Sequence, residues 1–324
     1  MVYLALAVGC SLAIGMIFKY AGRATMDRTA LLTVNYLAAV AVAGGLLSLG
    51  TRTPSEGLVF SPTLIGLGVG TGALLIAGFF VLSVATDVAG MSLAIGVMRV
   101  SVVIPFLVSW LVWNETPTLG QGIGLVLASG AFFMIARKES ELAPVPAGVG
   151  AEVGAEPDSP SSALPDPSAV TDAVSTAVEE TDPKVFGVLA LTFLSGGAVD
   201  VTMKTFEEVY GADSSRVLFL LLAFGIAFLI GLVVVLWRGL RKEIWPDRRT
   251  ILWGVILGVI NYGSLEFILR AIEQLPGTVV FPLNNIAIVV LAAVLGVYVW
   301  DERLSTTNRV GLGLAVVALV LLNL

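Results

Sequence analysis

The chain has no histidine and only one cysteine among its 324 residues. The lack of histidine excludes enzymes that bind zinc through histidine and hydrolases that activate a serine with a histidine base. The lone cysteine, Cys10, lies in an apolar segment and cannot form a disulfide within the chain. The sequence shows no nucleophile–base set and no cluster of metal-ligating side chains. We therefore expect a protein that is not an enzyme and that holds neither a metal ion nor a cofactor.

Charged residues are also scarce. They make up 13% of the chain, against 57% hydrophobic residues, whereas about a quarter of the residues of a soluble protein are charged. A surface that meets lipid needs few charges, which predicts an all-α integral membrane protein in contact with the bilayer. The sequence also lacks a basic patch interleaved with aromatic residues, so we expect no nucleic-acid partner.

Ten apolar runs are long enough to cross a bilayer, for which about 17–25 helical residues are needed. The first run has no basic segment before it and no clear cleavage site after it, so we interpret it as a membrane helix and not as a removed signal peptide. The chain is therefore predicted to cross the membrane ten times, at about 2–20, 29–50, 63–85, 90–113, 118–136, 185–205, 214–237, 250–271, 276–299 and 306–324.

Residues 137–184, between the fifth and sixth runs, differ from the rest of the chain. They hold ten acidic and three basic residues, a net charge of −7 against −6 for the whole chain. This segment is rich in Pro, Ala and Ser and has no aromatic residue, so it cannot bury enough apolar surface to offset the entropy of ordering. We predict a disordered linker that joins two five-helix halves, 1–136 and 185–324. A regulatory or partner-binding role is the alternative to a passive tether.

The two halves share an internal repeat. At a constant offset of 187 positions, four pairs of residues match: Gly90 with Gly277, Trp113 with Trp300, Glu115 with Glu302, and Gly124 with Gly311. Lys19 and Lys204, in the first and sixth runs, match at an offset of 185. Because each half has an odd number of helices, the second half enters the membrane from the other side. Inverted repeats of this kind enclose a binding site near the midplane and support alternating access.

Lysine and arginine predict the orientation, because cytoplasmic loops carry an excess of both. If the amino terminus is outside, the cytoplasmic loops hold a large basic set: Arg23, Arg28, Arg137, Lys138, Lys184, Arg238, Arg241, Lys242, Arg248, Arg249, Arg303 and Arg309. The other side has only Arg52 and Arg216, with Lys204 and Arg270 at helix ends. We expect a multi-pass protein of the inner (plasma) membrane with both termini outside and the linker in the cytoplasm.

Ionisable side chains within the predicted helices are candidate site residues, because they are costly in hydrocarbon unless they face a cavity or a partner. Arg99, near the centre of the fourth helix, is expected to bind an anionic group of the substrate or to pair with Glu266 across the two halves. Glu266 and Asp200 are candidates for coupling or proton binding, since a buried carboxylate is charged or neutral depending on its neighbours. The alternative for each is a structural ion pair with a base four residues later, Arg270 or Lys204.

Asparagines add neutral polar groups to the same region. Asn261, Asn284 and Asn285 lie near the centres of the eighth and ninth helices and are predicted to bind substrate, with Asn35 of the second helix as a further polar group. Hydrogen bonding between helices is the alternative explanation. Adjacent residues point about 100° apart on a helix, so at most one of Asn284 and Asn285 should face a cavity directly.

Two prolines and two repeated acids are candidate moving parts. Pro105 in the fourth helix and Pro282 in the ninth free backbone carbonyls and are candidate hinges or gates; a static bend is the alternative. Glu115 and Glu302 lie at matching corners, where a gate role competes with the favoured one, capping of the following helix. The glycines at every second position of 66–72 are interpreted as helix-packing residues.

The sequence resembles the EamA-type carriers of the drug/metabolite transporter superfamily in three features. These are the duplicated five-helix halves, the corners WNE and WDE followed nine residues later by Gly124 and Gly311, and the run VVFPLNNIAIVV. The resemblance implies ten helices, a central cavity formed by both halves, and secondary transport of small polar metabolites or drugs, often as export. Members are usually described with both termini in the cytoplasm, unlike the count above. The first helix lacks the carboxylate that the related small multidrug resistance proteins use, which shifts any coupling role to Glu266 or Asp200.

The sequence thus predicts a secondary active transporter that moves a small polar or amphipathic metabolite by alternating access. Arg99 favours a substrate with a carboxylate or phosphate. One alternative is a proton-coupled exporter of cationic drugs, in which Glu266 neutralises Arg99 and Asp200 titrates. An alternative of another class is a non-transporting scaffold or sensor that acts through the linker. The expected partners are the lipid bilayer and a small-molecule substrate, with protons and a second copy in a homodimer as further candidates.

Overall fold

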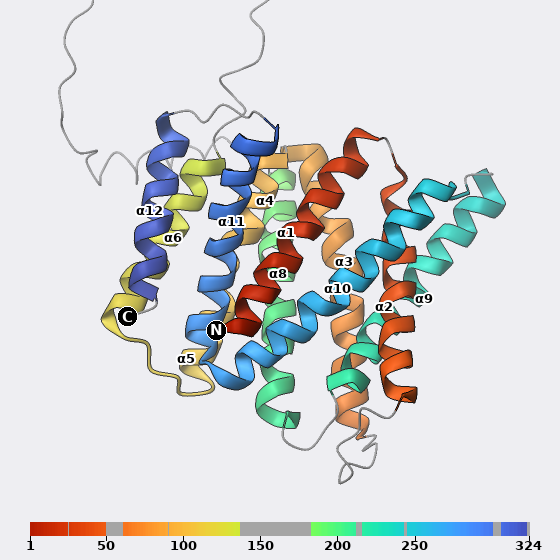
Figure 1. The fold of residues 1–324 in the computed structure, drawn as a ribbon, viewed down its shortest axis with the longest axis horizontal. Coiled ribbons are helices and arrows are strands. Elements are labelled where there is room, and N and C mark those ends of the chain that lie inside the picture. Colours follow the sequence, from red (N-terminus) through yellow and green to blue (C-terminus); the bar gives the residue numbers. More distant parts are fainter. Residues whose placement is uncertain are drawn as a thin grey trace, which may run out of the picture.

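The computed structural model describes residues 1–24, 26–49, 61–89, 91–136, 183–211, 216–242, 245–300 and 306–322. Within these ranges the chain forms eleven α-helices and no strand. The first half contains α1 (Val2–Arg23), α2 (Arg28–Ser48), α3 (Pro62–Ala89), α4 (Met91–Val100), α5 (Val103–Leu111) and α6 (Leu119–Ala136). The second contains α8 (Pro183–Tyr210), α9 (Arg216–Lys242), α10 (Arg248–Gln274), α11 (Gly277–Trp300) and α12 (Thr306–Leu322). Figure 1 shows these helices gathered in one bundle.

Seven of these helices are long and apolar enough to cross a membrane: α1, α2, α3, α8, α9, α10 and α11. Three shorter apolar stretches, Val97–Leu111, Leu119–Ala131 and Arg309–Leu322, come from α4 with α5, from α6 and from α12. The prediction of an all-helical membrane protein is therefore confirmed, and the chain passes through the membrane several times.

Two long helices begin at an aspartate that caps otherwise unpaired backbone amides. The Asp27 carboxylate accepts hydrogen bonds from the amides of Thr29 and Ala30, at 2.9 and 3.2 Å. At the start of α10, Asp247 accepts a bond of 3.0 Å from the amide of Thr250. Asp27 and Asp247 each lie just before an apolar span, and their bonds set where α2 and α10 begin.

Figure 1 shows the marks N and C close together in the lower left part of the bundle, toward the same end of it. We call this the terminal end; α6 ends and α8 begins at the opposite end. Basic residues gather at the opposite end, among them Arg238, whose Nη2 lies 3.0 Å from Oδ2 of Asp27. Arg216, at the start of α9, pairs at 2.9 Å with Glu273 at the terminal end.

The prediction of one continuous helix over 90–113 is wrong. The segment forms two helices, α4 and α5, separated by a two-residue turn that begins at Ser101. Pro105 has no backbone N–H, so the Ser101 carbonyl cannot receive the usual bond from the residue four positions later. It accepts instead from the amide of Ile104, at 2.9 Å. The break therefore follows from the proline, and it lies beside Arg99.

Helices of the two halves pack closely against one another. α2 packs on α9 and α10, α3 packs on α8 and α9, α1 packs on α10, and α6 packs on α12. Glycine permits the two closest approaches. A Cβ atom on Gly72 would clash with the backbone oxygen of Ala223, and one on Gly258 would clash with that of Asn35. These two contacts bring α3 against α9 and α10 against α2.

The glycines of 66–72 divide into two pairs. Gly72, and Gly68 one turn earlier, face α9, where a Cβ on Gly68 would meet Leu222. Gly66 and Gly70 have no such neighbour within 4 Å. A packing role therefore holds for one helix face only. The largest fully buried apolar side chains of the bundle include Phe206, Phe219, Phe224, Phe281 and Leu31.

Several predictions concern residues outside the described ranges. The linker predicted at 137–184 lies outside them except for its last two residues, which begin α8. Glu302, Arg52 and Arg303 also lie outside. The linker and the division into two halves at that point therefore stay predictions.

Candidate functional site

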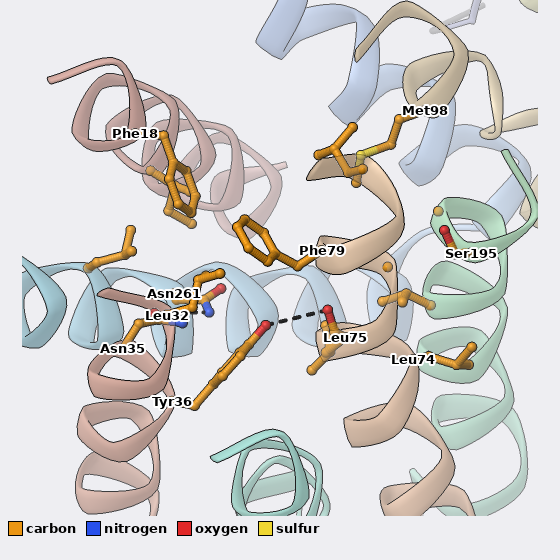
Figure 2. Close-up of a pocket in the computed structure, with 16 residues that line it drawn as sticks. Phe18, Leu32, Asn35, Tyr36, Leu74, Leu75, Phe79, Met98, Ser195 and Asn261 are labelled. Carbon is orange, nitrogen blue, oxygen red and sulfur yellow. Dashed lines mark hydrogen bonds between the residues drawn. The ribbon is translucent and has the colours of Figure 1, made fainter. Parts of the chain in front are cut away.

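A cavity of about 230 Å³ lies where six helices meet. Its walls come from α1, α2, α3, α4, α8 and α10, so both halves contribute. On each helix the lining residues lie near the middle or toward the opposite end of the bundle. Figure 2 shows these side chains: Ile14, Phe18, Leu32, Asn35, Tyr36, Leu74, Leu75, Gly78, Phe79, Leu82, Met98, Ser195, Gly196, Val199, Leu257 and Asn261.

Two asparagines meet in the wall of this cavity. Nδ2 of Asn261 in α10 donates to Oδ1 of Asn35 in α2, at 3.2 Å. Asn35 is 1% exposed. Gly258, one turn before Asn261, lets α10 approach α2 closely enough for this bond. The structure therefore places Asn261 in a cavity wall, and its role in substrate binding stays a prediction.

The remaining cavity wall is mainly apolar and aromatic. The rings of Phe18 and Phe79 lie 6.3 Å apart at an angle of 20°. Below them in Figure 2, the hydroxyl of Tyr36 donates to the Leu75 carbonyl at 3.5 Å. Ser195 adds a hydroxyl on the α8 side. None of the lining residues of this cavity carries a charge.

Arg99 lies beside the cavity and is not part of its lining. Its Nη1 donates to Oδ1 of Asn285 in α11 at 3.0 Å, and its charge interacts with that of Asp200 in α8. Nδ2 of Asn285 in turn donates to the Phe281 carbonyl at 3.0 Å, which orients the amide. The predicted pairing of Arg99 with Glu266 is wrong, because Arg99 lies where α4, α8 and α11 meet.

Glu266 has a partner on its own helix. Its Oε1 accepts a bond of 2.7 Å from Nε of Arg270, so the local ion pair is present. Its Oε2 is buried with no hydrogen-bond partner among the described residues. The hydroxyl of Tyr262 and Oδ1 of Asn284 are in the same situation within that part of the chain. One oxygen of Glu266 is thus left without a donor among the described residues.

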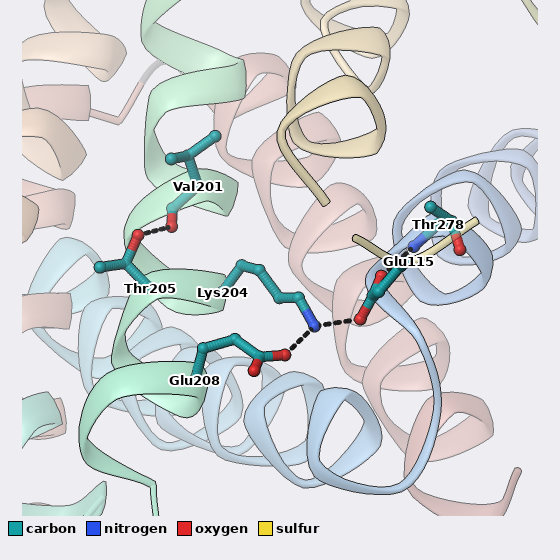
Figure 3. A network of polar contacts seen from close by, with 6 residues as sticks. All are labelled: Glu115, Val201, Lys204, Thr205, Glu208 and Thr278. Atoms are coloured by element: carbon teal, nitrogen blue, oxygen red, sulfur yellow. Dashed lines mark hydrogen bonds and ion pairs between the residues drawn. The ribbon is translucent and has the colours of Figure 1, made fainter. Parts of the chain in front are cut away.

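A second polar cluster lies at the terminal end (Figure 3). Lys204 of α8, 1% exposed, forms ion pairs with Glu115 after α5 and, at 2.5 Å, with Glu208 one turn along α8. Glu115 also accepts a bond of 3.1 Å from the Thr278 amide at the start of α11. The chain turns this corner at Asn114, whose φ of 55° lies in the left-handed region that asparagine tolerates. We call Glu115, Lys204, Glu208 and Thr278 the lysine network.

The lysine network corrects two predictions. The predicted ion pair of Asp200 with Lys204 is wrong, because the fold brings Glu115 to Lys204 from 89 positions away in the sequence. Glu115 does not cap the helix that follows it. Thr118 and Gln121 cap α6 through two reciprocal bonds of 3.0 and 3.2 Å, while Glu115 reaches across to α11.

The two predicted hinge prolines differ in their effect on the backbone. Pro282 lies inside α11, which continues through it, and is three residues before Asn285. Pro105 is the third residue of α5, four positions after Ser101, where the break between α4 and α5 begins. The structure thus shows a bend point at one proline, while the role of either as a hinge or gate stays a prediction.

Sequence reasoning missed several residues of the cavity and, in the lysine network, the pairing of Lys204 with Glu115. Phe18, Phe79 and Ser195 line the cavity, but within one sequence nothing separates them from residues that face the core or lipid. Lys204 and Glu115 did carry a signal. A lysine and an acid both recur at matching positions of the other half, which is unusual in a chain with few charges.

The second half of the chain matches a known family. Residues 185–324 match the model of the EamA-like transporter family, part of the drug/metabolite transporter superfamily. The resemblance found in the sequence is therefore confirmed. The match coincides with the second five-helix half predicted above.

Two further similarities cover nearly the whole chain. An uncharacterized protein of Haemophilus influenzae (strain ATCC 51907 / DSM 11121 / KW20 / Rd) is 24% identical over 317 residues, which cover 94% of this chain and 92% of the relative. A protein of known crystal structure matches 100% of this chain and 99% of its own with a TM-score of 0.67, at 15% identity. Identity this low shows a shared fold alone.

Proposed function

We propose that this membrane protein, whose residues 185–324 match the model of the EamA-like transporter family, is a secondary active transporter. It moves a small polar or amphipathic molecule across the membrane by alternating access. The family is one of transporters and not of enzymes. The observation that carries the proposal is a cavity between the two halves with an ion-pair network joining those halves on one side of it.

The proposed architecture is ten membrane segments in two inverted repeats. α4 and α5 count as one broken segment, so α1–α6 and α8–α12 supply five each. Contacts between helices support this arrangement, because they recur in matched pairs. α1 packs on α10 as α8 packs on α3, and α2 packs on α10 as α9 packs on α3. Such symmetry is what inverted-repeat carriers use to exchange their two states.

The positions of the cavity and the lysine network suggest which end is closed. The cavity residues lie toward the opposite end of the bundle, while Lys204 and Glu115 lie at the terminal end. The network ties the corner after α5 to α8 and α11. Transport would require these contacts to break as the terminal end opens.

The sidedness of this state rests on the basic residues. They gather at the opposite end, for example Arg238, Arg248 and Arg249, and cytoplasmic loops are enriched in such residues. We therefore place the opposite end in the cytoplasm and both termini outside, in the inner (plasma) membrane. The structure then represents a state whose cavity faces the cytoplasmic half of the bundle.

Asp200 and Glu266 remain the proposed coupling sites. Asp200 shares a junction with Arg99, so a change in its charge would alter the balance of charge where α4, α8 and α11 meet. The alternative of a cationic-drug exporter needs Glu266 to neutralise Arg99, whereas Glu266 is paired with Arg270. We therefore favour the metabolite carrier. Deleting 140–180 tests the sensor alternative, since a carrier keeps its transport and a sensor loses its output.

Cysteine labelling tests the carrier proposal, because Cys10 is the chain's sole cysteine. In a Cys10→Ser background, Ser195→Cys places a thiol in the cavity wall. We expect a membrane-impermeant maleimide to label it in inverted vesicles and not in intact cells. Adding Lys204→Met should raise labelling in intact cells several-fold, because the terminal end opens more often.

The matched control for this experiment is Glu208→Gln, which keeps the pair between Lys204 and Glu115 and should change labelling little. Labelling that stays one-sided in Lys204→Met would contradict alternating access through this end. Labelling of Ser195→Cys only in intact cells would reverse the proposed orientation and leave the carrier proposal standing.

A further inference from the structure

The two asparagines of the cavity leave a specific set of hydrogen-bonding groups unused. A primary amide offers two N–H donors and a carbonyl acceptor. The bond from Asn261 to Asn35 uses one N–H of the first and one lone pair of the second. Within the described residues, no other bond is made by either side-chain amide. This leaves the Nδ2 group of Asn35 and the carbonyl oxygen of Asn261 wholly unused, together with the second N–H of Asn261 and the second lone pair of Asn35. A donor and an acceptor therefore lie next to each other in the wall.

The amide pair sits beneath aromatic rings. Figure 2 shows Asn35 and Asn261 side by side, with the rings of Phe18 and Phe79 on the same side of the cavity. Aromatic faces pack well against a flat apolar group. The volume of about 230 Å³ is below the range of about 300–1,000 Å³ typical of sites for drug-sized ligands. The cavity thus suits a ligand of about one ring.

The cavity is also unsuited to an ion. No lining residue is charged, and moving an unpaired ion out of water is costly. Arg99, the nearest candidate for an anion, lies outside the lining and is already bonded to Asn285, and its charge also interacts with that of Asp200.

We propose that this cavity binds an uncharged planar molecule with a carboxamide or lactam edge, whose carbonyl accepts from Asn35 and whose N–H donates to the oxygen of Asn261. This inference rests on the proposed carrier function and narrows its substrate class. It replaces the anionic substrate that Arg99 suggested in the sequence.

Three single-ring probes of similar size and different charge test the inference: benzamide, benzoate and benzylammonium. A ligand that binds only the folded state raises its stability, so thermal unfolding of the purified full chain is followed against each probe. We expect a concentration-dependent rise in Tm with benzamide and none with the two ions. Asn261→Leu and the milder Asn261→Ser should each weaken benzamide binding at least tenfold, while Ser129→Ala on α6, away from the cavity, should leave it unchanged.

Other outcomes would overturn the inference. Stabilisation by benzoate that disappears in Arg99→Ala would assign an anionic substrate, and stabilisation by benzylammonium would assign a cationic one. Stabilisation by none of the three probes, or by benzamide equally in the folded Asn261→Ser variant, would remove the amide pair from ligand binding. In each case the labelling of Ser195→Cys reports separately on whether the protein alternates between states.

Discussion

Two interfaces of this bundle, α2 with α10 and α3 with α9, have the same packing and different chemistry. Gly258 meets the backbone oxygen of Asn35 in the first, and Gly72 meets that of Ala223 in the second. Gly72 and Gly258 are 186 positions apart, and Asn35 and Ala223 are 188 apart, close to the offset of 187 seen at the repeated corners. The glycines that allow close approach therefore occupy matching positions in both halves.

The polar groups do not follow this match. Asn35 bonds to Asn261 in the α2–α10 interface, whereas the matching positions in the other interface are Ala223 and Leu75. A glycine contact depends on backbone shape, so a duplicated scaffold keeps it in both copies. A buried polar pair is needed only where a ligand or partner uses it. In the proposed two-repeat architecture, the repeat supplies the frame and the α2–α10 interface carries the proposed recognition chemistry.

The largest expected effect comes from filling the close approaches. Gly258→Leu and Gly72→Leu should each destabilise the fold by about 3 kcal/mol or more, because a side chain would overlap backbone that cannot shift easily. Size-exclusion profiles and thermal unfolding in detergent would measure this. Gly70→Ala is the matched control, since Gly70 has open space, and equal losses in all three variants would contradict the comparison.

A smaller effect is expected from the lysine network. Lys204→Met leaves Glu115 and Glu208 without their cation. Glu208 is 42% exposed, so water can solvate its carboxylate and limits the cost. We expect the free energy of unfolding to fall by about 2 kcal/mol. Glu208→Gln should cost less than about 1 kcal/mol, because solvent screens the partly exposed Glu208 carboxylate and Lys204 keeps its pair with Glu115. Thermal unfolding of both variants measures the difference. A larger loss of stability in Glu208→Gln than in Lys204→Met would mean that Glu115 is not the main partner of Lys204.

The asparagine pair should couple by about 1 kcal/mol, the usual net contribution of a hydrogen bond. In a double-mutant cycle of Asn35→Leu and Asn261→Leu, the double variant should lose less stability than the sum of the single losses. The matching cycle of Ala223→Gly and Leu75→Ala should be additive, because that pair has no polar bond. Coupling of the same size in both cycles would show that packing alone links these positions.

The smallest effect is a pH dependence at the start of α10. Bonds from the hydroxyl and amide of Thr250 lower the pKa of Asp247. The stability that Asp247 contributes is therefore complete above the ordinary pKa of an aspartate. It is lost as the pH falls through the lowered pKa of the folded state. Ser61, 186 positions earlier, precedes α3 at the matching place. Asp247→Ser should flatten the dependence of Tm on acidic pH, measured from pH 6 downward. An unchanged slope would assign that dependence to other groups.

Much of the framework could be predicted from the sequence. The helices lie close to the predicted runs, and the offset of 187 between Trp113 and Trp300 pointed to two related halves. The fourth run was the exception. Its helix breaks at Ser101, because Pro105 cannot donate to the Ser101 carbonyl and the amide of Ile104 does so instead. Asn261 was correctly singled out as a polar group within a helix, but its partner was not identified.

Sequence by itself determined which segments are helical and apolar, because a bilayer imposes a length and a hydrophobicity that are local properties of the chain. Tertiary structure alone decided that Lys204 meets Glu115 in place of Asp200, that Arg99 meets Asn285 in place of Glu266, and that Asn261 meets Asn35. A buried polar group pairs with whatever partner the neighbouring helices bring within about 3 Å. Those neighbours are set by packing between segments 89, 186 and 226 positions apart, which no local pattern in the sequence records.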